Sequence, residues 1–77
     1  MIHPTIGRVV WFQPSKSSDQ PLRDQPFAAL ITYVCDDRCI NIGGFDALGW
    51  PVSACSVKLI QDDDPLPTGG YYAQFGA

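Results

Sequence analysis

Glutamate is missing altogether from this 77-residue sequence, because all eight acidic residues are aspartate. Glutamate favours helices, whereas the short carboxylate of aspartate bonds the neighbouring backbone in turns. Seven prolines and seven glycines are scattered along the chain, and only residues 27–42 and 52–64 form long segments free of both. These two segments are rich in β-branched residues, tyrosine and cysteine, which favour strands. The pattern predicts an all-β chain.

Basic residues are also scarce, with five Lys and Arg and a formal net charge of −3. General nucleic-acid binders neutralise phosphates with a basic surface, so we expect no direct nucleic-acid binding. No apolar run approaches the roughly 20 residues of a membrane-spanning helix, and no signal peptide opens the sequence. We therefore expect a soluble cytoplasmic protein with no membrane partner.

The sequence has one histidine, His3, and three cysteines. A catalytic triad needs a base that a third group holds, and nothing in the sequence provides one for His3. An odd cysteine count without a secretory signal indicates free thiols, although a Cys35–Cys39 disulfide across a tight turn is an alternative. A zinc site formed by His3, Cys35, Cys39 and Cys55 is disfavoured, because metal-binding pairs usually have the tighter C-x₂-C spacing. We expect no catalysis, no metal and no cofactor.

One small domain accounts for residues 1–77, since domains usually contain at least about 50 residues. We expect strands at residues 7–12, 27–35, 39–45 and 51–60, and a short closing edge strand at 71–75. Turns are expected at 36–38 and 46–49, a long polar loop at 13–26 and a C-terminal tail at 62–77. The adjacent Gly43 and Gly44 indicate a bulge or a sharp bend in the third strand. Together these features predict a small SH3-like, partly open antiparallel barrel of four to five strands.

Five short motifs cover most of the chain: HPTIGRVVWF at 3–12, QPFAALI at 25–31, DRCINI at 37–42, FD at 45–46 with Gly49, and SVKLIQ at 56–61. These motifs resemble a family of small, largely uncharacterised proteins of tailed phages and prophages. Members of that family commonly end in a Trp-containing tail, which residues 74–77 lack. The resemblance implies a phage-encoded accessory protein in the cytoplasm of the infected bacterial host, and by itself implies no activity.

The expected strand 27–35 is apolar on both faces. Alternation places Leu30, Thr32 and Val34 on one face, and it places Tyr33 on the other with residues 27, 29, 31 and 35. A strand with one solvated face usually shows polar residues there, so both faces need cover. We expect self-association through Leu30, Thr32 and Val34, and the alternative is that the 13–26 loop folds over them. Trp11 and Tyr33 are expected in the core.

Arginines and aromatic residues supply the remaining candidates for binding. Arg8 and Arg38 are suited to phosphates, because a guanidinium can form two parallel hydrogen bonds to one. Trp50, which we expect to be exposed, or Tyr71 offers a face on which a base can stack, and Asn41 can bond a base or ribose edge. The alternative is that Arg38 and Asn41 only satisfy the turn and the sheet edge.

These observations favour a non-catalytic homo-oligomer that binds a small, anionic, nucleotide-like ligand at the seams between its copies. In a phage accessory protein, such binding would sequester a host immune signal. The alternative is an interaction protein that inhibits a host defence enzyme through an apolar or an acidic surface, and a minor virion or assembly component is a further alternative. The acidic surface would require a cluster of aspartates drawn from Asp19, Asp24, Asp36, Asp37, Asp62, Asp63 and Asp64.

Overall fold

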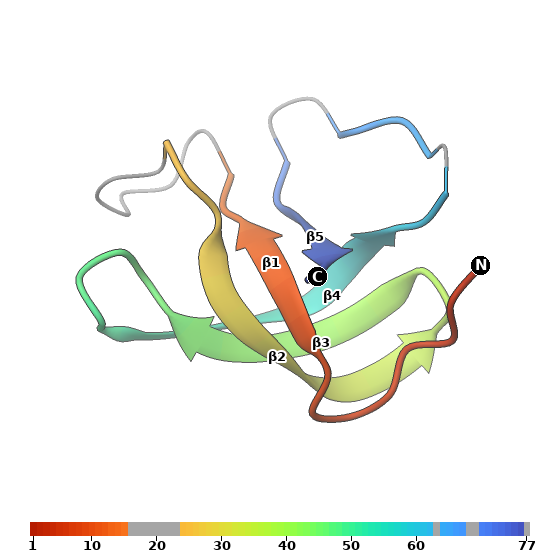
Figure 1. Cartoon of the computed structure of the whole chain (residues 1–77), viewed down its shortest axis with the longest axis horizontal. Helices are drawn as coiled ribbons and strands as arrows, with labels where there is room; N and C mark the ends of the chain where they lie inside the picture. Colours follow the sequence, from red (N-terminus) through yellow and green to blue (C-terminus); the bar gives the residue numbers. More distant parts are fainter. Residues whose placement is uncertain (16–23, 63, 68–69, 77) are drawn as a thin grey trace.

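The described part of the chain folds into five strands (Figure 1). They form where β-branched and aromatic residues are concentrated. The computed structural model describes residues 1–15, 24–62, 64–67 and 70–76. It contains the strands β1 (Val9–Gln13), β2 (Phe27–Asp36), β3 (Cys39–Phe45), β4 (Pro51–Ile60) and β5 (Tyr72–Phe75). No helix occurs among these residues, so the predicted all-β class is confirmed. The bounds of β3 and β4 are those predicted from the sequence.

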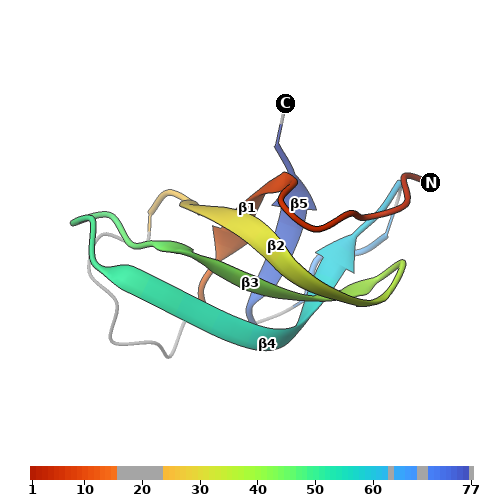
Figure 2. The same cartoon turned by 90° about the horizontal axis from the view of Figure 1, so that it is seen from below.

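The five strands close into a barrel in the order β1-β2-β3-β4-β5 (Figures 1 and 2). Successive strands from β1 to β4 pair antiparallel, and β5 pairs antiparallel with β1. β5 runs parallel to β4, with Lys58 opposite Tyr72. The predicted small barrel is confirmed, and its fifth strand lies between two neighbours rather than at an edge.

Local turns set the ends of the strands. β1 begins at Val9 because the preceding residues form a turn in which Gly7 has a φ of 88°, a backbone conformation that glycine adopts readily. In the β3–β4 hairpin, the N–H of Gly49 donates to the carbonyl of Asp46 at 3.0 Å, which closes the turn predicted at 46–49. The Asp46 carboxylate also accepts hydrogen bonds from the N–H groups of Leu48 and Trp50, each at 2.9 Å.

Gly44 allows β3 to approach β2 closely. A Cβ atom at this position would lie 2.7 Å from the Cα of Ala29 and would also clash with the carbonyl oxygen of Ala28. At Gly43, by contrast, a Cβ would meet only the Thr32 methyl group, at 3.4 Å. The bulge predicted at the glycine pair does not occur, because Gly43 and Gly44 pair in regular register with both β2 and β4. The β2–β3 register shifts lie further along β2, between residues 31 and 33 and between residues 34 and 36.

The inward side chains fill the barrel with apolar residues. The buried core consists of Val10, Phe12, Phe27, Ala29, Ile31, Ile40, Ile42, Val57, Leu59 and Ala73. Each strand contributes to it at alternate positions, as expected for a barrel whose outer face is exposed.

Two expectations about side-chain faces were wrong. A register shift in the β2–β3 pairing between Ile31 and Tyr33 interrupts the alternation along β2. Tyr33 is therefore 59% exposed, whereas Val34 packs against the core and not on the outer face with Leu30. Trp11 is 41% exposed because its neighbours on β1 both point inward.

Gln61 connects three separate segments at the end of β4 and is only 3% exposed. Its Nε2 donates to the carbonyls of Ile2 and Asp37 at 2.6 and 3.0 Å, and its Oε1 accepts from the N–H of Ile2 at 3.3 Å. Its backbone N–H donates to the Asp64 carboxylate at 3.0 Å. This residue ties the N-terminal segment, the β2–β3 turn and the β4–β5 loop together.

Candidate functional site

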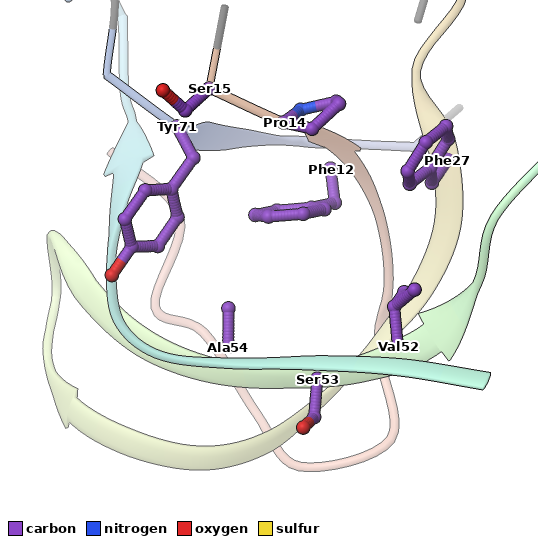
Figure 3. A pocket seen from close by; sticks show the side chains of 8 residues that line it. All are labelled: Phe12, Pro14, Ser15, Phe27, Val52, Ser53, Ala54 and Tyr71. Carbon is purple, nitrogen blue, oxygen red and sulfur yellow. The ribbon is translucent and has the colours of Figure 1, made fainter. Parts of the chain in front are cut away.

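A pocket of about 340 Å³ opens at the mouth of the barrel (Figure 3). We call it the mouth pocket, and its lining residues are Phe12, Pro14, Ser15, Phe27, Val52, Ser53, Ala54 and Tyr71. Phe12 and Phe27 are direct cross-strand partners on β1 and β2. Figure 3 shows the Phe12 ring on one side of the pocket, Val52 and Ala54 opposite it, and Tyr71 at the flank.

Aromatic contacts form one wall of the mouth pocket. The ring centroids of Phe12 and Phe27 lie 6.4 Å apart, and those of Phe12 and Tyr71 lie 5.8 Å apart in an edge-to-face arrangement. Such pairs contribute about 0.5–1.5 kcal/mol beyond their buried area. The Tyr71 hydroxyl donates to the carbonyl of Cys55 at 2.9 Å, which fixes the ring. The lining residues carry no acidic or basic side chain, so the pocket is suited to a flat, largely apolar group.

Arg38, predicted to bind phosphate, is held by Asp64. Its Nε donates to Asp64 Oδ2 at 2.8 Å and its Nη2 donates to Oδ1 at 3.3 Å. The hydrogen bond from Arg38 holds the pKa of the Asp64 carboxyl below its usual range, and the N–H of Gln61 acts in the same direction. The hydrogen bond to Asp64 likewise raises the pKa of the Arg38 guanidinium.

Arg8 has a different environment. Its guanidinium carbon lies 4.5 Å from the centroid of the Phe75 ring, which is a cation–π contact. No ion pair to Arg8 occurs among the described residues. Arg8 is therefore the more available of the two arginines.

The five predicted ligand residues do not meet in one copy of the chain. Asn41 Oδ1 accepts the N–H of Ser56 at 2.9 Å, which supports a bulge in β4 where Ser56 has a φ of 53°. Trp50 is 68% exposed, as predicted, in the turn beyond β3. Arg38 precedes the other end of β3, roughly 20 Å away along a seven-residue strand. Of the five, only Tyr71 lines the mouth pocket.

Sequence reasoning missed most of the mouth pocket. Phe12 and Phe27 flank the long 13–26 loop, and their pairing depends on the β1–β2 register. A loop of this length does not fix that register, so it could not be predicted from the sequence. A search for aromatic residues at both ends of that loop would have suggested the pair.

The three thiols are free in the structure. Cys35 and Cys55 are exposed, and a hydrogen bond with the Cys39 thiol raises the pKa of Cys35. No group of three metal-ligating side chains gathers among the residues described. The His3 side chain instead contacts the Asp37 carboxylate, with its Nδ1 3.0 Å from that group.

Four aspartates gather at the Gln61 end of the barrel, and we call this region the acidic end. They are Asp36, Asp37, Asp62 and Asp64. Three of them have cationic or imidazole partners there, because Asp62 lies 3.5 Å from the N-terminal ammonium, Asp37 contacts His3 and Asp64 binds Arg38. Asp24 lies elsewhere, beside Ala47, and Asp19 and Asp63 fall outside the described residues.

The outer surface of β1, β2 and β3 is apolar. We call the group Val9, Trp11, Ala28, Leu30 and Phe45 the outer patch. The strand register places Val9 beside Leu30, and Ala28 between Trp11 and Phe45. The four large side chains are 41–56% exposed. A shallow groove of about 180 Å³ lies beside Val9, Leu30 and Phe45. Of the predicted interface residues, Leu30 belongs to this patch, Thr32 is exposed beside it and Val34 is not on it.

No protein-family model matches this chain, and comparisons with curated proteins and with solved structures find no match. Within the described part of the chain, no helix is long and apolar enough to cross a membrane. The function of the pocket must therefore be inferred from its own residues.

Proposed function

We propose that this chain is a phage-encoded, non-catalytic accessory protein whose mouth pocket binds the flat ring of a nucleotide-like ligand. The aromatic wall formed by Phe12, Phe27 and Tyr71 carries the proposal. The mouths of small barrels are common ligand sites, and pockets of about 300–1,000 Å³ accommodate small molecules. Ligand binding without catalysis is favoured, because the only ionisable side chain among the lining residues is the Tyr71 phenol.

The anionic part of the ligand needs a cation from outside the mouth pocket. Arg8 is the first candidate, since it has no ion pair among the described residues. Arg38 would have to exchange the Asp64 carboxylate for phosphate oxygens. Neither arginine lines the mouth pocket of its own copy, which favours a ligand that spans two copies.

Self-association is the second part of the proposal. The outer patch exposes several large apolar side chains, and leaving apolar area in water forgoes about 25 cal/mol per Å². Closed homo-oligomers are the commonest way in which soluble proteins cover such surfaces. Arg8 directly precedes Val9 of the outer patch, so contact through this patch would bring Arg8 to a seam between copies. An oligomer of this kind would sequester a host immune signal in the cytoplasm of the infected cell.

Calorimetry against cyclic dinucleotides, cyclic trinucleotides and ADP-ribose derivatives tests the proposal. Stacking on an aromatic side chain is worth about 1–3 kcal/mol per base, so Tyr71→Ala should weaken binding about tenfold or more. Tyr71→Phe retains the ring and should bind nearly as the wild type does. Tyr33→Ala is the matched control, because Tyr33 is an exposed tyrosine that does not line the pocket. The assignment of the pocket would be refuted if Tyr33→Ala weakened ligand binding and Tyr71→Ala left it intact.

A second candidate is an interaction protein that inhibits a host defence enzyme. The outer patch favours it, because exposed apolar patches of this kind commonly mark protein-binding surfaces. The acidic end offers weaker support, since three of its carboxylates already have partners. No heat with any member of the nucleotide panel, together with an enzyme inhibited by the wild type and not by Leu30→Asp, would favour this candidate.

A further inference from the structure

The first half of β4 has one free edge in the part of the chain that the structure describes. β3 pairs with one side of β4 from Pro51 to Lys58. β5 pairs with the other side only from Lys58 to Ile60. No described strand therefore lies beside the outer edge of residues 51–56 (Figure 2). An open edge of this kind is a template for pairing with another strand.

The hairpin hydrogen bonds show which backbone groups face this edge. The N–H of Asp46, at the end of β3, donates to the carbonyl of Trp50 at 2.9 Å. In an antiparallel ladder, alternate residues turn both their N–H and C=O groups to the same neighbour. Every second residue counted from Trp50 therefore faces β3, and Pro51, Ser53 and Cys55 face the outer edge.

The hydrogen bond of Tyr71 supports this orientation independently. Its hydroxyl donates to the carbonyl of Cys55 at 2.9 Å, and Tyr71 immediately precedes β5, on the side of β4 away from β3. The Cys55 carbonyl thus faces the outer edge and already has a donor.

With respect to the described residues, the outer edge leaves an unusual set of backbone groups without a partner. Ser53 offers both its N–H and its C=O, Cys55 offers its N–H and Pro51 offers its C=O. Two groups are missing from this set. Proline has no N–H, and the Cys55 carbonyl is occupied by Tyr71.

We propose that a second copy of this chain docks antiparallel on this edge, with Ser53 opposite Ser53 of the partner subunit. The two Ser53 residues then exchange two hydrogen bonds across a two-fold axis. Cys55 of each copy donates to Pro51 of the other, which gives two more. The missing N–H of Pro51 falls opposite the Cys55 carbonyl that Tyr71 already satisfies, so no free group on the edge is left without a partner.

This complementarity favours a second copy over an unrelated extended peptide. An ordinary strand would place an N–H against the occupied carbonyl of Cys55 and a carbonyl against the nitrogen of Pro51, and neither pair forms a hydrogen bond. A polar group buried without a partner costs about 1–3 kcal/mol. β4 itself avoids both mismatches in this register.

The contact also places two mouth pockets side by side. Val52 and Ala54 line the pocket, and in the proposed register Val52 lies beside Ala54 of the partner subunit. Only this consequence rests on the proposed function, because the pairing of the edges does not require a ligand. A wild type that dimerises without binding any nucleotide, or a monomeric wild type that binds one, separates the two proposals.

Two substitutions at Ser53 test the contact. Ser53→Pro removes an N–H that faces the edge and not the β3 ladder, and proline is tolerated at sheet edges. We expect light scattering behind a sizing column to show half the native mass of the wild type. Ser53→Ala is the matched control, because it keeps the N–H and should keep the mass. Thermal unfolding of both variants checks that the barrel is intact. A monomeric wild type, or an unchanged mass for a folded Ser53→Pro, would overturn the proposal.

Oxidative cross-linking tests the register. The Cα atoms of a hydrogen-bonded antiparallel pair lie about 5.5 Å apart, within disulfide reach. Ser53→Cys, made in a chain whose three native cysteines are serine, should therefore form a covalent dimer on mild oxidation. A chain that retains only Cys55 should not, because the two copies of Cys55 would lie roughly 13 Å apart along the strands. A Cys55 dimer in place of the Ser53→Cys dimer would exclude this register.

Discussion

At the scale of single residues, Gln61 explains why Arg38 is not free to bind a ligand. The buried amide uses both of its side-chain ends on the N-terminal segment and the β2–β3 turn. Its backbone N–H and the Arg38 guanidinium share the Asp64 carboxylate. Leaving the buried amide of Gln61 without its partners would cost about 1–3 kcal/mol. Arg38 therefore helps to anchor the β4–β5 loop through Asp64. This matches the alternative stated above, in which Arg38 has a structural role at the turn.

The Asp64 carboxylate should make stability depend on pH in the acid range. Its pKa is lowered in the folded chain, first by the hydrogen bond from Arg38. A lowered folded-state pKa stabilises the fold above the ordinary carboxyl pKa of about 3.9, and this contribution is lost as the pH falls through the lowered value. In thermal unfolding, the wild type should exceed Asp64→Asn in Tm at neutral pH. The difference should shrink below about pH 4 and in high salt.

Arg38→Gln provides the control for this prediction. It removes the main cause of the pKa shift while the Gln61 N–H remains. In the Arg38→Gln background, Asp64→Asn should change the fall of Tm at acid pH much less than it does in the wild type. An undiminished difference would mean that Arg38 does not set the pKa of Asp64.

At the scale of strands and turns, the sequence predicted most of the fold. The bounds of β3 and β4, the aspartate turn at Asp46 and the closing fifth strand follow from turn residues and β-branched runs. The faces of β2 did not follow. Both faces are apolar, so nothing in the residue pattern marked the register shift that exchanges Tyr33 and Val34.

The candidate site was harder to predict, because it depends on contacts between distant strands. Tyr71 was identified as a stacking residue, and it lines the mouth pocket. Phe12 and Phe27 read as ordinary core residues, and their joint position at the barrel mouth depends on pairing across a long loop. Pro51 was a missed signal, since proline in a sheet is confined to edge strands, bulges and the first residue of a strand.

Gly44 offers a sharp test of how closely β2 and β3 approach. In Gly44→Ala the new methyl group would meet backbone atoms of Ala28 and Ala29, which cannot move without distorting the barrel. Overpacking of this kind costs about 1–3 kcal/mol. For a domain of this size, Tm should fall by roughly 4 °C or more in a thermal melt at fixed protein concentration.

Gly43→Ala is the matched control for this substitution. The two glycines are neighbours in the same strand, and the added methyl group at Gly43 would meet only the Thr32 methyl at an ordinary contact distance. Its Tm should stay close to that of the wild type, with any gain coming from reduced freedom of the unfolded chain. Equal losses for both variants would indicate a general need for glycine in this segment.

At the scale of the whole molecule, two different surfaces are proposed to join copies of the chain. The outer patch lies on β1, β2 and β3, and the free edge lies on the first half of β4. Two distinct two-fold contacts on one chain generate a closed dimer of dimers when their axes meet at right angles. A barrel this small buries only about 60% of the surface that its unfolded chain exposes, so assembly adds needed burial.

The native masses of four proteins should resolve the two contacts. Leu30→Asp puts a charge on the outer patch, and Ser53→Pro removes a donor from the edge of β4. When both surfaces join copies of the chain, the wild type contains four copies, each single variant two and the double variant one. Light scattering at matched concentrations measures all four.

An unchanged mass for Leu30→Asp would assign the outer patch to a different partner, which is what the enzyme-inhibiting candidate requires. An unchanged mass for Ser53→Pro would instead leave the outer patch as the only proposed self-contact.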